Sequence, residues 1–285
     1  ALMPSVHMKE HTMPHAGSPA DECALRHLAM MQVCDSVFPV GAFALSNGME
    51  TFVQRDLLRS SADFEQYLKD YVEVAAYREI GQMVIAGKMA AGRDPDDAGF
   101  VNGLAELDAL CVALQSAREI REGQNRMCMR MIKLVDQMEA QPLQPVDSRR
   151  GHGVDRGEAS KRGGAARPRT IPHVDRYKRL VDSGTCFGMH SIVMGLYAAD
   201  KAASLRDAAV TYCYSLLSAL TVCAVKAVPI SQYAGQVALS RAFPEIVAAV
   251  DLALTLTPDD LGVSGAYIDI AAMQHETLYS RLYMS

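Results

Sequence analysis

The sequence predicts an all-α fold, a single-domain, bundle-like arrangement of eight or more helices. Aromatic residues make up only 6% of the 285 residues and Trp is absent, whereas Met occurs 16 times. The core is therefore expected to consist of small and flexible side chains on helices. Apolar residues recur at spacings of three and four over most of the chain, and no stretch of useful length alternates as a β-strand would.

Residues 1–21 lack this periodicity and are rich in His, Met and Pro, so they are predicted to form a disordered tail. His7, His11 and His15 recur every four residues, a spacing that on a helix could share a borderline cation such as nickel. Three prolines in the same stretch oppose a stable helix. We therefore expect a solvated tail, with weak metal buffering as the alternative.

Helical periodicity begins at Cys23 and stops before the cluster at 38–41, and a second helix is predicted from about Ser46. The segment 61–90 has carboxylates in its first turn and then apolar residues every three or four positions. This pattern predicts one long amphipathic helix. Two more helices are predicted, starting at Asp94-Pro95 and at Ser116.

The stretch at about 141–174 differs from the segments around it. It is rich in Pro and Gly and holds hardly any large apolar residue, and between residues 141 and 179 there are ten Lys or Arg against four Asp or Glu. Such a composition buries too little apolar surface to fold. We predict a disordered basic insertion that interrupts a helical domain spanning 22–285. It would contact acidic partners or, as we favour, be a tolerated surface linker.

Helices are predicted to resume near Cys186. Residues 204–207, Ser-Leu-Arg-Asp, form a capping-box signature for a helix that runs to Lys226. Its residues 208–225 carry no charge, but six of them are Thr, Tyr or Ser, which favours a buried core helix over a membrane span. The remaining predicted elements are a helix from Ser231 that breaks near Pro244, a capped turn at 257–260 and a last helix from Ala266 to the C-terminus.

Composition also indicates the compartment and the class of partner. The net charge of −5 gives no electrostatic reason to expect nucleic acid. The seven Cys are an odd number without a CxxC pair, which is typical of a reducing environment. The first twenty residues contain no continuous apolar run of the signal-peptide kind. We expect a cytoplasmic protein that binds neither nucleic acid nor membrane.

Motifs of nucleotide-binding and metalloprotease enzymes are absent: the chain has no GxxxxGK[ST], no GxGxxG and no HExxH. A Cys/His hydrolase would need a histidine base, and the candidates are His27, His190 and His275. His190 follows Cys186 at helical spacing, but a satisfied buried histidine is the commoner role. The Met- and Cys-rich run at 127–131 is explained by a flexible core. We predict no catalytic residue and no enzyme, with a hydrolase as an alternative.

Residues 35–50, DSVFPVGAFALSNGME, describe a tight and largely buried link between two helices, because Pro and Gly interrupt apolar residues there. The segment closely resembles the N-terminal signature of the urease accessory protein UreF family. The matching residues are Asp35, Ser36, Phe38, Pro39, Gly41, Phe43, Ser46, Gly48, Met49 and Glu50.

Two further stretches resemble the same family. Residues 216–239 are similar to its long helix and the P-L-G-Q sequence that follows, and residues 273–285, MQHETLYSRLYMS, are similar to its C-terminal tail. There are two departures. Ile230-Ser231 stands where the family has Leu-Gly, so the backbone of that turn is expected to differ. The sequence 188–190, Gly-Met-His, replaces an adjoining Gly-His.

The resemblance implies an all-helical, non-catalytic, cytoplasmic protein that forms a homodimer and binds the accessory protein UreD, also called UreH. The complex would recruit the GTPase UreG, and together they would deliver nickel to apo-urease with GTP hydrolysis supplied by UreG. No cofactor would be bound stably, and nickel would be bound at most transiently. A stand-alone nickel-binding chaperone is the other alternative.

The resemblance also assigns residues to roles. Five would face the GTPase or an ion passage: Lys226, Pro229, Gln232, Gly235 and Gln236. The tail, expected to be frayed in isolation, would contact UreD through His275, Glu276, Ser280, Arg281, Leu282 and Ser285. The signature loop would be structural through Phe38, Pro39, Gly41, Phe43, Ser46, Gly48 and Glu50. The choice of nickel ligand stays open among Glu50, His190 and Cys186.

Overall fold

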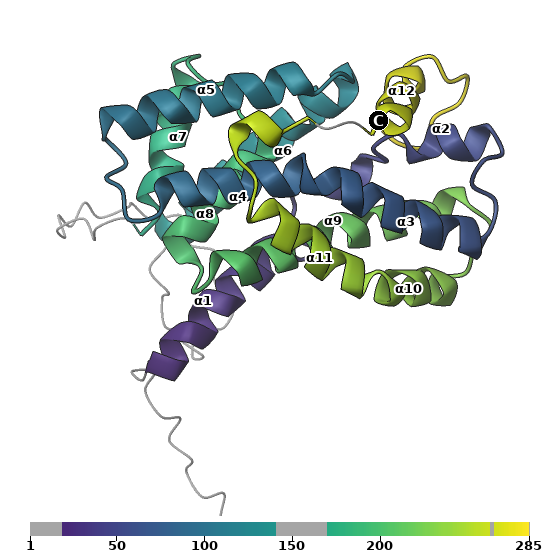
Figure 1. The fold of residues 1–285 in the computed structure, drawn as a ribbon, viewed down its shortest axis with the longest axis horizontal. Coiled ribbons are helices and arrows are strands. Elements are labelled where there is room, and N and C mark those ends of the chain that lie inside the picture. Colours follow the sequence, from purple (N-terminus) through teal and green to yellow (C-terminus); the bar gives the residue numbers. More distant parts are fainter. Residues whose placement is uncertain (1–18, 141–169, 263–264, 285) are drawn as a thin grey trace, which may run out of the picture.

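The computed structural model describes residues 19–140, 170–262 and 265–284, and within these ranges the chain is all-α, as predicted (Figure 1). The described residues form twelve α-helices and two short 3₁₀ turns, joined by loops. In chain order they are α1 (Pro19–Cys34), η1 (Ala42–Ala44), α2 (Met49–Gln54), α3 (Ser61–Ala76), α4 (Glu79–Ala90), α5 (Ala98–Leu114), α6 (Arg118–Ala140), α7 (Pro172–Asp182), α8 (His190–Lys201), α9 (Leu205–Ala227), α10 (Gln232–Arg241), α11 (Phe243–Ala253), η2 (Pro258–Asp260) and α12 (Ala266–His275).

The centre of the fold is the crossing of α4 and α8, which are buried over most of their length. Gly195 of α8 sits so close to α4 that a Cβ atom there would overlap the carbonyl oxygen of Met83. Because neither backbone could move away without opening the core, glycine is required at this crossing. In Figure 1, α5, α6 and α7 lie on one side of the pair and α9, α10 and α11 on the other, while α1 projects from the body.

The turn that leads into α8 is held by a buried carboxylate. Asp108 of α5 accepts hydrogen bonds from the backbone N–H groups of Phe187 (2.6 Å) and Gly188 (3.1 Å) and from the hydroxyl of Tyr177. The same hydroxyl accepts a hydrogen bond from the N–H of Met189 at 2.8 Å. All these groups are thereby satisfied inside the core, which fixes where α8 begins.

The prediction of one helix over 61–90 is wrong, since the chain breaks at Tyr77–Arg78 into α3 and α4, which follow in line across the molecule (Figure 1). Two distant groups hold the break. The carbonyl of Tyr77 accepts a hydrogen bond from the N–H of Gly262 at 3.1 Å, and the guanidinium of Arg78 pairs with Asp269 of α12. Both partners lie far along the chain, so a local pattern carries no sign of them.

Two segments were expected to be disordered, and in each the last residues are ordered in the structure. Residues 19–21 belong to α1, where Pro19 suits a first helical position and carboxylates follow in the first turn. Residues 170–174 are ordered as well, because Ile171 is buried and Asp200 accepts hydrogen bonds from the first N–H groups of α7. The tail 1–18 and the insertion 141–169 lie outside the described residues.

Several helix boundaries follow from capping groups. The side chain of Ser204 caps α9, a break precedes Pro244, and Thr257 forms a capping box, all as predicted. Ser231, predicted only as the start of a helix, accepts from a backbone N–H group and caps α10. Helices resume with α7 at Pro172, before the point near Cys186 where they were predicted to resume. Four other starts differ: α2 begins at Met49, α5 at Ala98 after its cap Asp97, α6 at Arg118 and α8 at His190. The last helix ends at His275 instead of continuing to the C-terminus.

One helix among the described residues, α9, is long and apolar enough to span a membrane by length and composition alone. Half of its most apolar stretch is buried inside the molecule. Since α9 also packs against helices on several sides, it is placed as the core helix that its polar side chains predicted.

Candidate partner-binding site

The signature loop, residues 35–48, connects α1 to α2 through two glycines with positive φ, Gly41 (+89°) and Gly48 (+86°). A Cβ atom on Gly48 would lie 2.9 Å from the backbone nitrogen of Ala272, so the loop can approach α12 only because this residue is glycine. The thiol of Cys223 on α9 donates to the carbonyl of Phe43 at 3.4 Å. The loop is thus held between α12 and α9.

Burial in this loop is less complete than the sequence indicated. Phe38 and Ser46 are buried, but Pro39 is exposed and Phe43 keeps 41% of its surface accessible. The reason is that η1 turns its backbone inward, where the carbonyls of Phe43 and Ala44 accept hydrogen bonds from other segments. The aromatic ring of Phe43 is therefore available at the surface.

A buried carboxylate joins the signature segment to the C-terminal tail. Glu50, the second residue of α2, is 2% exposed and accepts from the backbone N–H groups of Leu282 (2.7 Å) and Tyr283 (3.1 Å). Its second oxygen also lies 3.0 Å from Nε2 of His275. Glu50 thereby gives these two backbone N–H groups the hydrogen bonds that water would otherwise supply.

His275 is fully buried between two carboxylates, with Nδ1 2.7 Å from Glu119 of α6 and Nε2 facing Glu50. Each nitrogen of the His275 ring therefore has a carboxylate partner. Arg281 donates to the other oxygen of Glu119 at 2.6 Å. We call these four residues, Glu50, Glu119, His275 and Arg281, the clasp.

The tail makes further contacts beyond the clasp. Gln54 donates to the carbonyl of Ser280 at 2.5 Å, and the N–H of Met284 donates to the carbonyl of Ala44 at 2.8 Å. The hydroxyl of Tyr283 donates to the carbonyl of Cys223, also at 2.8 Å. The expectation of a tail that is frayed in isolation is therefore wrong for residues 276–284, which fold against their own chain. Ser285 lies outside the described residues.

The residues predicted to face a GTPase or an ion passage lie at the end of α9 and on α10. Lys226, Gln232 and Gln236 are exposed and line a groove between these helices, and Pro229 is exposed in the turn that joins them. Gly235 is buried instead. A Cβ atom at this position would lie 3.0 Å from the side chains of Thr221 and Val225, so a glycine lets the two helices approach closely. Its role is close packing of α10 on α9.

The Ile230-Ser231 departure does not strain this turn. Ser231 has φ −76° and ψ 158°, an ordinary extended conformation, and its hydroxyl accepts from the N–H of Ala234 at 3.1 Å. A serine at this position therefore caps α10 without requiring glycine.

The three motif segments converge on one side of the molecule. Tyr283 of the tail contacts α9 one turn before Lys226, and Met284 contacts the signature loop at Ala44. The same three segments carry exposed apolar side chains: Phe43, Val222, Tyr233, Tyr279, Leu282 and Met284. We call the surface of these segments the junction face. They also carry the exposed polar side chains of Lys226, Gln232, Gln236 and Arg281, and such a mixture is typical of a protein-binding surface.

The alternative of a Cys/His hydrolase finds no support at six of the seven cysteines; the seventh, Cys23, is exposed on α1. A nucleophilic cysteine needs a lowered pKa, yet burial raises the pKa of Cys34, Cys186, Cys213 and Cys223 to about 12. Burial likewise raises the pKa of Cys111 and Cys128. These thiols stay protonated and unreactive at neutral pH.

The candidate nickel ligands are not brought together. Glu50 is engaged in the clasp, and within the described residues no group of three or more His, Cys, Asp or Glu side chains is arranged to hold a metal ion. His190 is buried at the start of α8 with neither ring nitrogen hydrogen-bonded.

Sequence reasoning missed four residues that build the site: Gln54, Glu119, Cys223 and Tyr283. Glu119 lies in the mixed-charge stretch Arg-Glu-Ile-Arg-Glu, where no spacing sets it apart from its neighbours. Tyr283 lies in the tail motif and could have been included with it. The other two carry no signal in the sequence.

The fold and the site define the class of protein: an all-helical chain that closes its C-terminal tail over an N-terminal loop through a buried histidine held between two carboxylates. A family model described as UreF matches residues 58–243, and the chain belongs to the UreF family. It is similar to the urease accessory protein UreF of Streptococcus thermophilus, with 26% identity over 259 residues that cover 91% of this chain and 94% of the relative.

Two other relatives show the same extent of similarity. The urease accessory protein UreF of an Arthrobacter species is 28% identical over 90% of this chain and 96% of its own length. The UreF of Actinobacillus pleuropneumoniae is 30% identical over 90% of this chain and 98% of its own length.

Proposed function

We propose that this protein is a non-catalytic scaffold that holds a UreD-type accessory protein and a UreG-type GTPase for GTP-dependent insertion of nickel into apo-urease. Membership of the UreF family supports a role in urease maturation. The observation that carries the finer proposal is the junction face, where the three motif segments meet and leave exposed side chains such as Leu282 (65%) and Tyr233 (81%).

The partners are assigned to neighbouring parts of the junction face. The tail, presented by the clasp, is the contact for the UreD-type protein, and the groove lined by Lys226, Gln232 and Gln236 is the contact for the GTPase. The cation of Lys226 and the amides of the two glutamines offer donors and acceptors to a polar partner surface, while the tail offers apolar side chains.

The remaining features of the proposal follow from the family resemblance. The scaffold acts as a homodimer in the cytoplasm, binds neither nucleic acid nor membrane, and holds no stable cofactor. Nickel is cargo that the assembled complex passes on, so transient contacts suffice.

Co-elution tests this proposal. The purified chain is mixed with UreD-type and UreG-type proteins from the same source, with nickel and GTP, and complex formation is measured by size-exclusion chromatography with light scattering. We expect the wild-type chain to co-elute with both partners. In the tail, Leu282→Asp should abolish binding of the UreD-type protein, because only the backbone of Leu282 takes part in the clasp and the fold is preserved.

Two matched variants sharpen the result. Lys226→Glu should release the GTPase while leaving the UreD-type protein bound. Leu25→Asp changes an equally apolar, 56% exposed side chain on α1 and should leave both partners bound. If the wild-type chain stays alone in every mixture, or if Leu25→Asp and Leu282→Asp behave alike, the proposed scaffold surface is wrong.

A further inference from the structure

The signature loop ends in a tight turn directly before α2. The N–H of Met49 donates to the carbonyl of Ser46 at 3.0 Å, and the two residues between them, Asn47 (+51°) and Gly48 (+86°), both have positive φ. This is the backbone of a type I′ turn, for which Asn-Gly is a preferred pair. Asn47 is not among the residues that match the family signature, so the resemblance assigns it no role.

The side chain of Asn47 ties this turn to the body of the fold. Its amide nitrogen donates to the hydroxyl of Tyr71 on α3 at 2.8 Å. Tyr71 is a firm anchor, because it is 3% exposed and stacks against the ring of Tyr67, with ring centroids 6.2 Å apart. Asparagine suits the position in two ways, since it tolerates positive φ and supplies a side-chain donor.

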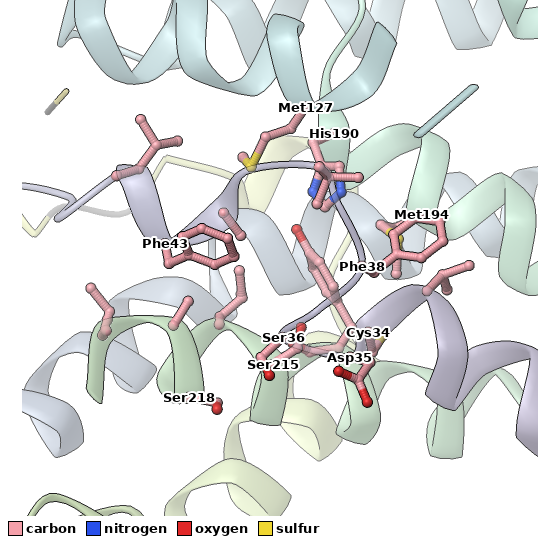
Figure 2. Close-up of a pocket in the computed structure, with 18 of the residues that line it drawn as sticks. Cys34, Asp35, Ser36, Phe38, Phe43, Met127, His190, Met194, Ser215 and Ser218 are labelled. Atoms are coloured by element: carbon pink, nitrogen blue, oxygen red, sulfur yellow. Dashed lines mark hydrogen bonds between the residues drawn. The ribbon is translucent and has the colours of Figure 1, made fainter. Parts of the chain in front are cut away.

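Side-chain packing alone does not hold the loop in place. A pocket of about 60 Å³ lies between the signature loop and helices α6, α8 and α9 (Figure 2). Asn47 is one of the residues that line it. Because the pocket interrupts the packing beneath the loop, polar contacts take a larger share in fixing the position of the loop.

The turn determines where Glu50 lies. Glu50 is the second residue of α2, which has only six residues, and its N–H donates to the hydroxyl of Ser46 at 3.4 Å. A helix this short has little stability of its own, so its direction depends on the turn that precedes it. A shift of the turn would move Glu50 away from the N–H of Leu282, which lies 2.7 Å from it. We propose that Asn47 is a positioning residue for the clasp: its hydrogen bond to Tyr71 fixes the turn that places Glu50 against the tail.

This role rests on the proposed function only in that the tail is taken as a partner contact. Amide hydrogen exchange is measured on the chain alone, whereas the proposed function is tested by co-elution. Unchanged exchange of the tail in an Asn47 variant would therefore reject the positioning role alone. A wild-type chain that binds no partner would reject the proposed function alone.

Asn47→Gly tests the role, because glycine adopts positive φ freely but lacks the side-chain donor. We expect the amides of Leu282 and Tyr283 to exchange about fivefold faster, which is the effect of one lost hydrogen bond. Buried amides of α8 separate this role from a purely structural one, since they exchange only when the core opens. If Asn47 merely stabilised the fold, the α8 amides would exchange faster and the tail amides would not, and the proposal would be overturned.

Two further variants show whether the bond to Tyr71 is responsible. Tyr71→Phe removes the acceptor and should also speed exchange of the tail amides, and the double variant should exchange no faster than the faster single variant. Effects that multiply would overturn the proposal. Asp56→Gly is the matched control, because Asp56 (+56°) is the other non-glycine residue with positive φ in the described part of the chain and lies beyond the end of α2. It should leave the tail amides unchanged, and an effect equal to that of Asn47→Gly would likewise overturn the proposal.

Discussion

Glu50→Gln should release the C-terminal tail without unfolding the helical body. The substitution keeps the shape of the side chain but replaces one acceptor oxygen with an NH₂ group. Glu50 uses one oxygen for the N–H of Leu282 and the other for Tyr283 and His275. Whichever way the amide lies, a donor then faces a donor, and the charge opposite His275 is lost.

The magnitude follows from these contacts. The less costly orientation turns the NH₂ group toward Leu282 and forfeits one hydrogen bond to a charged group, about 1.5–3 kcal/mol. We therefore expect the free energy of opening the tail to fall by up to about 3 kcal/mol, or until the tail is fully released.

Amide hydrogen exchange measures this change directly. A loss of about 3 kcal/mol should speed exchange of the Leu282 and Tyr283 amides about a hundredfold. Glu276→Gln is the matched control, because it removes an ion pair with Arg118 at 3.0 Å whose partners are 60% and 30% exposed. Such a surface pair is worth at most about 1 kcal/mol.

Two outcomes would refute the reasoning. Unchanged protection of both amides in Glu50→Gln would mean that the clasp does not hold the tail. An equal increase of the exchange rate in the two variants would mean that the buried Glu50 holds the tail no more strongly than an exposed carboxylate does.

Three further predictions concern the body of the fold. Gly195→Ala should lower the free energy of unfolding by about 3 kcal/mol in urea, because the added methyl overlaps the carbonyl of Met83; wild-type stability would contradict the close crossing. The hydrogen bond from His173 to Asp200 raises the pKa of the imidazole, so this pair stabilises the fold below about pH 6.5, and the contribution is lost as pH rises through the raised value. The stability difference between wild type and Asp200→Asn should therefore shrink as the pH rises above about 6.5, and a constant difference would exclude the linkage. Ser231→Ala should cost about 1 kcal/mol through loss of the α10 cap, and no change in the urea midpoint would show that the hydroxyl does not cap.

Local patterns predicted local structure well. Periodicity found most helices, and Ser204 and Thr257 predicted their caps, because a cap depends on residues three positions away. The break at Tyr77–Arg78 was missed because Gly262 and Asp269 produce it from almost 200 residues away. The apolar spacing of a segment is the same whether or not a distant residue bonds to the segment and interrupts the helix.

The candidate site shows the same division. The resemblance placed Glu50 and His275 in separate motifs with separate roles, one structural and one for a partner. Their contact joins those roles, since the structural residue presents the partner-binding tail. Glu119 stayed unpredicted because the charge pattern of α6 does not indicate which carboxylate turns inward.

The clasp also bears on the order in which the molecule folds. Glu50 and Leu282 are 232 residues apart, and Gln54 and Ser280 are 226 apart. Closing a loop of that length is entropically costly, and the helices between must already be packed for Glu50 to meet the tail. The clasp should therefore form late, after the α4–α8 crossing. A partner that binds the closed tail would bind only molecules that have finished folding. The clasp would therefore make partner binding depend on complete folding.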